Sequence, residues 1–142
     1  MTLQPLEELE VQLSDGAEVL YRQLTEPLYD PTLKRPSSHA FGPKDADQGR
    51  PSFARSSLVS AQDSRDWHTA NAAKPSLAVW GCTVGAVQDE GTRAVDDSAT
   101  PGDKSPGHAY IDYRGLSGPE VKVVRAVLLA EALKLGEFPT MS

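Results

Sequence analysis

HAYIDY, at residues 108–113, and SGPEVKVVRAVLLAEALKL, at residues 117–135, are the two stretches that decide the fold. The first follows a Pro-Gly turn, is rich in residues that favour strands, and predicts a strand. The second opens with Ser117 and has Glu120 three residues later, the capping-box pattern of a helix start. Gly136 then supplies a stop signal. We therefore expect a strand over 108–113 that leads into a long helix over 118–135.

Two apolar stripes run along this expected helix. One contains Val121, Val124, Leu128, Ala132 and Leu135, and the other, on nearly the opposite side, contains Val123, Ala126, Ala130 and Leu133. A helix that packs on one sheet needs only one stripe. The second stripe, with its small alanines, leaves two alternatives. It packs against an N-terminal helix of the same chain, or it forms the interface of a homodimer.

Earlier apolar runs predict the rest of a small sheet and two further helices. The run over 77–84 is nearly all apolar, which is typical of a central strand covered on both faces. Ser60 is a good N-cap for the helix that follows it. Leu6, Leu9 and Leu13 share one face of a short N-terminal helix. We expect strands at about 18–24, 51–59, 77–84 and 108–113, and helices at about 5–14, 61–73 and 118–135.

The expected fold class is therefore α/β, with α+β as the alternative. Residues 1–142 form a single small domain, in which a mixed four-stranded sheet is packed by about three helices. Two segments lack regular patterning. The first, 27–49, carries four prolines, and the second, 89–107, is acidic and rich in proline and glycine. We expect both to be mobile loops, because prolines remove backbone donors and charged residues favour solvent.

Bulk properties exclude several classes of function. The 142 residues carry a net charge of −6, which opposes nonspecific binding to nucleic acid. No apolar run approaches the roughly 20 residues of a membrane helix, and the N-terminus lacks the pattern of a secretion signal. Cys82 is the only cysteine, so an internal disulfide and a multi-cysteine zinc site are excluded. We expect a soluble cytoplasmic protein, with Cys82 buried and inert in its strand.

Arg22 is the first candidate for ligand binding. It lies inside an apolar strand next to Tyr21, and a buried guanidinium is expensive unless it is paired. It would bind a small anionic ligand, such as a phosphate or carboxylate, through two parallel hydrogen bonds. The structural alternatives are that Arg22 faces solvent on an edge strand or pairs with an acid of the chain.

Two further groups of polar residues are candidates. Ser38 and His39 precede Asp45 and Asp47, so His39 with either aspartate could form an acid–base pair or half of a metal site. The alternative is ordinary turn chemistry, in which these side chains bind the nearby backbone. The second group is His108, Tyr110 and Asp112, which share one face of their strand because side chains alternate. Such a face suits a binding surface or an acid–base site. The alternatives are a solvent-facing side of the strand, or a histidine whose hydrogen bond fixes the end of the strand.

The spacing of the three histidines shows no metal-binding pattern, and no phosphate-binding or nucleophile motif is present. We therefore predict no metal site and no cofactor. Lacking any catalytic motif, the chain is first interpreted as a binding or regulatory module. The loop 27–49 and the face of His108, Tyr110 and Asp112 would hold a partner protein or a small ligand.

Several pieces of the sequence resemble a group of small bacterial proteins to which no activity is attached. These pieces are YRQ at 21–23, SSHAFGP at 37–43, DQG at 47–49 and HAYIDY at 108–113. The resemblance covers roughly residues 20–135. It implies a bacterial, intracellular protein of one domain.

A weaker similarity is to ADP-ribosyltransferases of the arginine–serine–glutamate type. It is carried by Tyr21-Arg22, Ser56-Ser57 and Gln88-Asp89-Glu90, which occur in the family's order. The usual Ser-Thr-Ser is absent, and a long helix follows where the family has often ended. The resemblance implies an enzyme that uses NAD or another nucleotide. In it Arg22 would contact the dinucleotide and Glu90 would stabilise the developing ribosyl cation. This is the alternative function.

Overall fold

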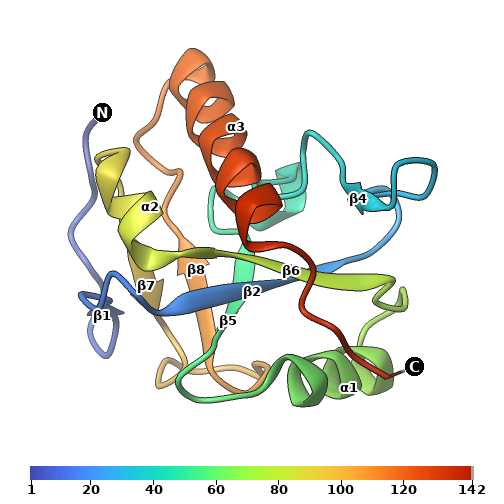
Figure 1. The fold of residues 1–142 in the computed structure, drawn as a ribbon. Coiled ribbons are helices and arrows are strands. Elements are labelled where there is room, and N and C mark those ends of the chain that lie inside the picture. Colours follow the sequence, from blue (N-terminus) through green and yellow to red (C-terminus); the bar gives the residue numbers. More distant parts are fainter. Residues whose placement is uncertain (142) are drawn as a thin grey trace.

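Six strands form one sheet in the computed structural model, which describes residues 1–141 (Figure 1). The strand order is β1-β7-β8-β5-β2-β6, and every neighbouring pair is antiparallel. The strands are β1 (Val11–Gln12), β2 (Val19–Leu24), β5 (Ser52–Arg55), β6 (Ala78–Thr83), β7 (Ala94–Asp96) and β8 (His108–Ile111). The fold is thus α+β, and the prediction of a mixed four-stranded sheet was wrong. β5 and β6 run parallel to each other, but β2 lies between them, so they do not pair.

Three α-helices cover the sheet, α1 (Ala61–Asn71), α2 (Val84–Asp89) and α3 (Gly118–Leu135). In Figure 1, α2 and α3 lie above the sheet and α1 lies below it. The start of α3 is as predicted, because Ser117 and Glu120 bind each other's backbone amides at 3.3 and 2.9 Å. The helix predicted over 61–73 is α1, and its N-cap is Ser60. Among residues 1–141, no helix has the length and apolar character needed to span a bilayer.

One face of α3 packs on the sheet, and the other is exposed. Val124, Leu128 and Ala132 are buried in the core, as the first stripe predicted. The second stripe is uncovered, with Val123 57% exposed. Among residues 1–141 it has no helical partner, since the helix predicted over 5–14 was wrong. The homodimer through this face stays a prediction.

Backbone pairing explains why residues 5–14 are not helical. Val11 and Gln12 form β1 opposite β7, and the amide of Leu13 donates to the carbonyl of Ala94 at 2.9 Å. Of the three leucines expected on one helical face, only Leu13 is buried, and Leu9 is 55% exposed. An isolated helix of this length is only marginally stable in water, so pairing with the sheet edge competes successfully with it.

The two segments expected to be loops contain regular structure. The first holds a separate two-stranded sheet, β3 (Tyr29–Asp30) with β4 (Arg35–Pro36), and a 3-10 turn, η1 (Asp45–Asp47). The second holds β7, whose Ala94 and Val95 are fully buried between β1 and β8. The prediction of loops was therefore wrong at the residues of β3, β4, η1 and β7. The mobility of the remaining residues stays a prediction.

The chain beyond α3 runs along the outer edge of β6. The amide of Phe138 donates to the carbonyl of Val79 at 2.9 Å, and its ring meets Tyr21 edge-on at 5.1 Å. Gly81 permits this close packing. A Cβ atom there would lie 2.7 Å from the carbonyl oxygen of Leu20 and 3.2 Å from the Phe138 ring.

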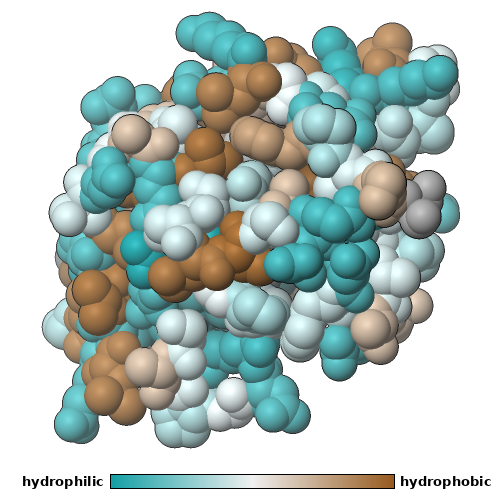
Figure 2. Space-filling view, turned by 60° about the horizontal axis from the view of Figure 1, so that its bottom comes forward, coloured by the Kyte–Doolittle hydropathy of each residue, from teal (hydrophilic) through white to brown (hydrophobic). Residues whose placement is uncertain are grey.

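Figure 2 shows that hydrophobic residues on the face that carries α1 are separated by hydrophilic ones.

Candidate functional site

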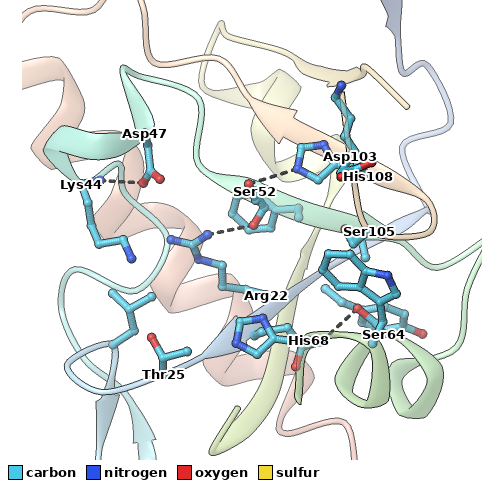
Figure 3. A pocket seen from close by; sticks show the side chains of 17 residues that line it. Arg22, Thr25, Lys44, Asp47, Ser52, Ser64, His68, Asp103, Ser105 and His108 are labelled. Atoms are coloured by element: carbon cyan, nitrogen blue, oxygen red, sulfur yellow. Dashed lines mark hydrogen bonds between the residues drawn. The ribbon is translucent and has the colours of Figure 1, made fainter. Parts of the chain in front are cut away.

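A cavity of about 350 Å³ lies where β2 and β5 meet α1 and the loop before β8 (Figure 3). A volume of this size suits a small ligand. Its wall is rich in groups that carry or can carry positive charge: Arg22, Lys44, His68, Lys104 and His108. Asp47 and Asp103 are the two carboxylates that also line it. In a protein of net charge −6, this concentration of positive groups distinguishes the cavity from the surface as a whole.

Arg22 is the most constrained of these groups. Its side chain is buried, with 6% exposed, and stacks over the Phe53 ring at 5.2 Å. Its Nε donates to the carbonyl of Ala40 at 2.9 Å, and its Nη1 donates to the carbonyl of Ser52 at 2.8 Å. Its Nη2 is buried and has no hydrogen-bond partner in the described part of the chain. Figure 3 shows the guanidinium between Lys44, Asp47 and Ser52.

Neither structural alternative for Arg22 holds. It does not face solvent, and no ion pair among residues 1–141 involves it. Burial lowers the pKa of Arg22, and the charge of Asp47 works in the opposite direction. The guanidinium is therefore a buried cation whose charge is met by two neutral carbonyl groups and by no bound carboxylate.

His108 lines the same cavity and lies between two oxygen atoms. Its Nε2 is 3.0 Å from Oγ of Ser52, and its Nδ1 is 2.5 Å from Oδ1 of Asp97. The sheet register produces the first contact. Ala54 pairs with His108 and Ser52 pairs with Tyr110, so Ser52 and His108 are diagonal neighbours on one face. Asp97 directly follows β7, the strand on the other side of β8.

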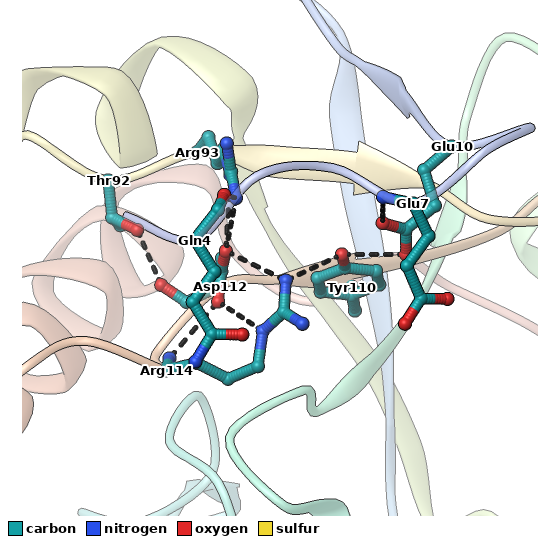
Figure 4. A network of polar contacts seen from close by, with 8 residues as sticks. All are labelled: Gln4, Glu7, Glu10, Thr92, Arg93, Tyr110, Asp112 and Arg114. Carbon is teal, nitrogen blue, oxygen red and sulfur yellow. Dashed lines mark hydrogen bonds and ion pairs between the residues drawn. The ribbon is translucent and has the colours of Figure 1, made fainter. Parts of the chain in front are cut away.

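The other two members of the predicted polar face do not line this cavity. Tyr110 and Asp112 are both 1% exposed and belong to an internal network (Figure 4). Asp112 accepts hydrogen bonds from Nε of Arg93 at 3.1 Å and from Nε of Arg114 at 2.9 Å. The Tyr110 hydroxyl donates to Glu10 at 2.8 Å. Of the predicted polar face, only His108 lines the cavity, and the other end of this face joins the sheet to the N-terminal segment.

Electrostatics agree with a structural role for this network. Burial alone would raise the pKa of Asp112, but hydrogen bonds from Arg114 and Arg93 lower it below its ordinary value. Burial and the hydrogen bond with Glu10 raise the pKa of Tyr110. Asp112 is therefore an ionised, fully paired carboxylate and Tyr110 a neutral phenol.

Ser38, His39 and Asp45 lie outside the cavity, all three exposed. Their segment contributes Lys44 and Asp47 instead. Sequence reasoning named Asp47 as a possible partner of His39 but did not single out Lys44. The prediction therefore identified the right segment, 27–49, in which the turn η1 brings Lys44 and Asp47 to the cavity.

Glu90 also lies outside this cavity. It borders a separate hollow together with Met1, Pro119 and Glu120. The structure does not bring Arg22 and Glu90 into one cavity, as the NAD-dependent alternative requires.

Two other features of the described residues bear on chemistry. Cys82 is fully buried, and burial, followed by the charge of Glu131, raises the pKa of its thiol to about 12. Among residues 1–141, no three histidine, cysteine or acidic side chains are grouped so as to hold a metal ion.

Comparison of the chain with protein-family models, with curated proteins and with solved structures finds no match. Any function is therefore argued from the site itself.

Proposed function

We propose that this chain is a binding module for a small anionic ligand, which Arg22 holds in the cavity. The single observation behind the proposal is the buried guanidinium, with an Nη2 that has no partner among the described residues and no carboxylate paired to it. Burying a charge without a partner costs several kcal/mol, so such a group is seldom kept without compensation. A carboxylate or phosphate oxygen would provide it.

The surrounding charges favour the same class of ligand. Lys44 and Lys104 line the cavity with Arg22, and neither forms an ion pair with an acidic side chain in the described chain. Cations that surround a cleft raise the local concentration of anions and speed their association. The protein's overall negative charge would oppose large polyanions, whereas a small anion needs only the local field.

The size and setting of the cavity fit a small metabolite rather than a polymer. A volume of about 350 Å³ is at the lower end of the range for small-molecule sites. Trp67 also lines the cavity and offers an apolar surface beside the cations. A cytoplasmic module of this kind would report the level of its ligand, and a partner protein would read the occupied state.

Isothermal titration and the fluorescence of Trp67 test this proposal with three probes: inorganic phosphate, succinate and NAD. Saturable binding of phosphate or succinate, lost on replacing Arg22, is the expected result. Binding of NAD with loss on Glu90→Gln would instead favour the ADP-ribosyltransferase alternative. If none of the three probes binds at millimolar concentration, the proposed function is wrong.

A further inference from the structure

We infer that Ser52, His108 and Asp97 form a nucleophilic triad, in which Ser52 attacks the carbonyl carbon of a small ester. The preference for an ester whose acyl half carries an anionic group rests on the proposed function. The nucleophile itself does not, since it depends on a different set of contacts.

The three side chains stand in the order that nucleophilic catalysis requires. The Ser52 hydroxyl donates to Nε2 of His108 over 3.0 Å, and Nδ1–H of His108 donates to Asp97 over 2.5 Å. Asp97 therefore fixes the imidazole with its proton on Nδ1, which leaves the lone pair of Nε2 facing the hydroxyl. Such triads are recognised by geometry and not by sequence position, because they recur on unrelated folds.

The exposure of the three side chains agrees with a nucleophilic role for Ser52. Ser52 is exposed although His108 and Asp97 are largely covered, with side-chain exposures of 15% and 13%. Ser52 borders two cavities, the one described above and a second of about 400 Å³ that Asp97 also lines. The hydroxyl therefore lies where two hollows meet, with room on either side for the acyl half and the alcohol half of a substrate.

Arg22 connects the triad with the anion site. Its Nη1 donates to the backbone carbonyl of Ser52, so a ligand oxygen bound at Nη2 lies beside the same residue. The positive charge also favours the negative charge that develops on the carbonyl oxygen during attack. A short dicarboxylic acid esterified at one end satisfies both requirements.

The reaction balances with water as the second reactant. Oγ of Ser52 bonds to the carbonyl carbon, its proton moves to Nε2 of His108, and the π electrons move to the carbonyl oxygen. The tetrahedral intermediate expels the alcohol, which takes the proton from His108. Water then adds to the acylated Ser52 and gives its proton to His108. The second collapse returns that proton to Oγ and releases the carboxylic acid.

The test uses mono-4-nitrophenyl succinate and 4-nitrophenyl acetate as probes. Release of nitrophenolate and intact mass spectrometry of the quenched protein are followed together. We expect an adduct of one acyl group, mapped to the peptide that contains Ser52, and faster reaction with the succinate ester. Ser52→Ala should abolish the adduct, and Asp97→Asn should slow acylation by about 10³-fold or more, as in other triads.

Matched controls separate this inference from the proposed function. Ser14→Ala removes an exposed hydroxyl outside both cavities and should react as wild type does. Ser52→Ala should still bind succinate, which also shows that the variant is folded. Wild-type protein that binds succinate but gives neither an acyl adduct nor nitrophenolate release above that of Ser52→Ala would overturn the triad alone. A Ser52 adduct from the acetate ester without succinate binding would support the triad and overturn the proposed anion site.

Discussion

The side chain of Arg22 is tied to the backbone of Ser52 by a hydrogen bond of 2.8 Å between Nη1 and the carbonyl oxygen. This bond joins β2 to the start of β5, beyond the last residues of these strands that pair directly, Tyr21 and Ala54. The cation of the proposed binding site and the hydroxyl of the inferred triad are therefore set at a fixed separation by the sheet itself. A substitution at Arg22 should therefore affect both anion binding and the reactivity of the Ser52 hydroxyl.

Arg22→Lys tests the geometry of the anion site while keeping its charge. A lysine cannot donate to Ala40, Ser52 and a ligand in the fixed directions of a guanidinium. We expect the dissociation constant for phosphate or succinate to rise at least tenfold, since a charge-assisted hydrogen bond contributes about 1.5–3 kcal/mol. Isothermal titration measures it. Arg35→Lys, at an exposed position of β4, is the matched control, and equal affinities for the two variants would contradict the proposal.

Gly81→Ala should destabilise the fold by about 1–3 kcal/mol, the range for overpacking a close contact. The added methyl group would lie 2.7 Å from the carbonyl of Leu20, a backbone atom that cannot move aside. Urea denaturation followed by circular dichroism measures the free energy of unfolding.

Gly118→Ala provides the contrast. It lies in the first turn of α3, and an added Cβ meets nothing within 4 Å. Its free energy of unfolding should stay within about 0.5 kcal/mol of wild type or rise. If both alanine variants behaved alike, the packing of β2, β6 and the tail would not be as described.

Acid should weaken the fold through three paired carboxylates. Burial would raise the pKa values of Glu18, Asp96 and Asp112, but hydrogen bonds and arginine charges lower them below the ordinary values. The folded state therefore binds protons less readily than the unfolded state. The resulting stability is present above the ordinary pKa of about 4 and is lost as the pH falls through the lower folded values. The urea concentration at the unfolding midpoint, measured from about pH 7 to about pH 2, should therefore decrease as the pH drops below about 4.

Asp112→Asn isolates one of these contributions. It leaves Arg93 and Arg114 without their shared carboxylate, and breaking such a buried pair costs about 3–5 kcal/mol. The variant should be less stable at neutral pH and should depend less on pH below it. Asp89→Asn, at an exposed position, should match wild type at every pH. An unchanged pH dependence in Asp112→Asn would contradict this assignment.

Cys82 should not react with thiol reagents while the protein is folded. Its side chain is fully buried, and a pKa of about 12 leaves almost no thiolate at neutral pH. Ellman's reagent at about pH 8 should label the protein only after urea is added, at a rate that follows unfolding. Labelling of the native protein at the rate of a free thiol would show that the strand β6 opens readily.

Strong local patterns in the sequence predicted much of the fold correctly. The strand over 18–24 and the helix over 118–135 form as expected, because a run of strand-favouring residues and a capping box act within one segment. β7 was missed because it has three residues and lies in an acidic stretch, and only its neighbours β1 and β8 make it a strand. The helix expected over 5–14 failed for the same reason, since a distant strand competes for its backbone.

The site could be predicted only in part. Arg22 and His108 were identified, because a cation in an apolar strand and a histidine at the start of a strand are unusual in themselves. Ser52 and Asp97 were missed. Ser52 is 56 residues from His108 in the sequence, and only the register of β5 with β8 brings the two together. Asp97 looked like one more acid in a charged loop until β7 placed it beside the imidazole.

The tail after α3 covers part of the outer edge of β6. β6 is the last strand of the sheet, and Phe138 occupies a carbonyl that would otherwise be open to another molecule. In a chain cut after Leu135, this edge of β6, a nearly all-apolar strand, would be uncovered. We expect it to pair more readily with the same edge of another molecule. Residues 136–141 thus cover part of an edge to which another chain could add a strand, although they lie outside every helix and strand of the fold.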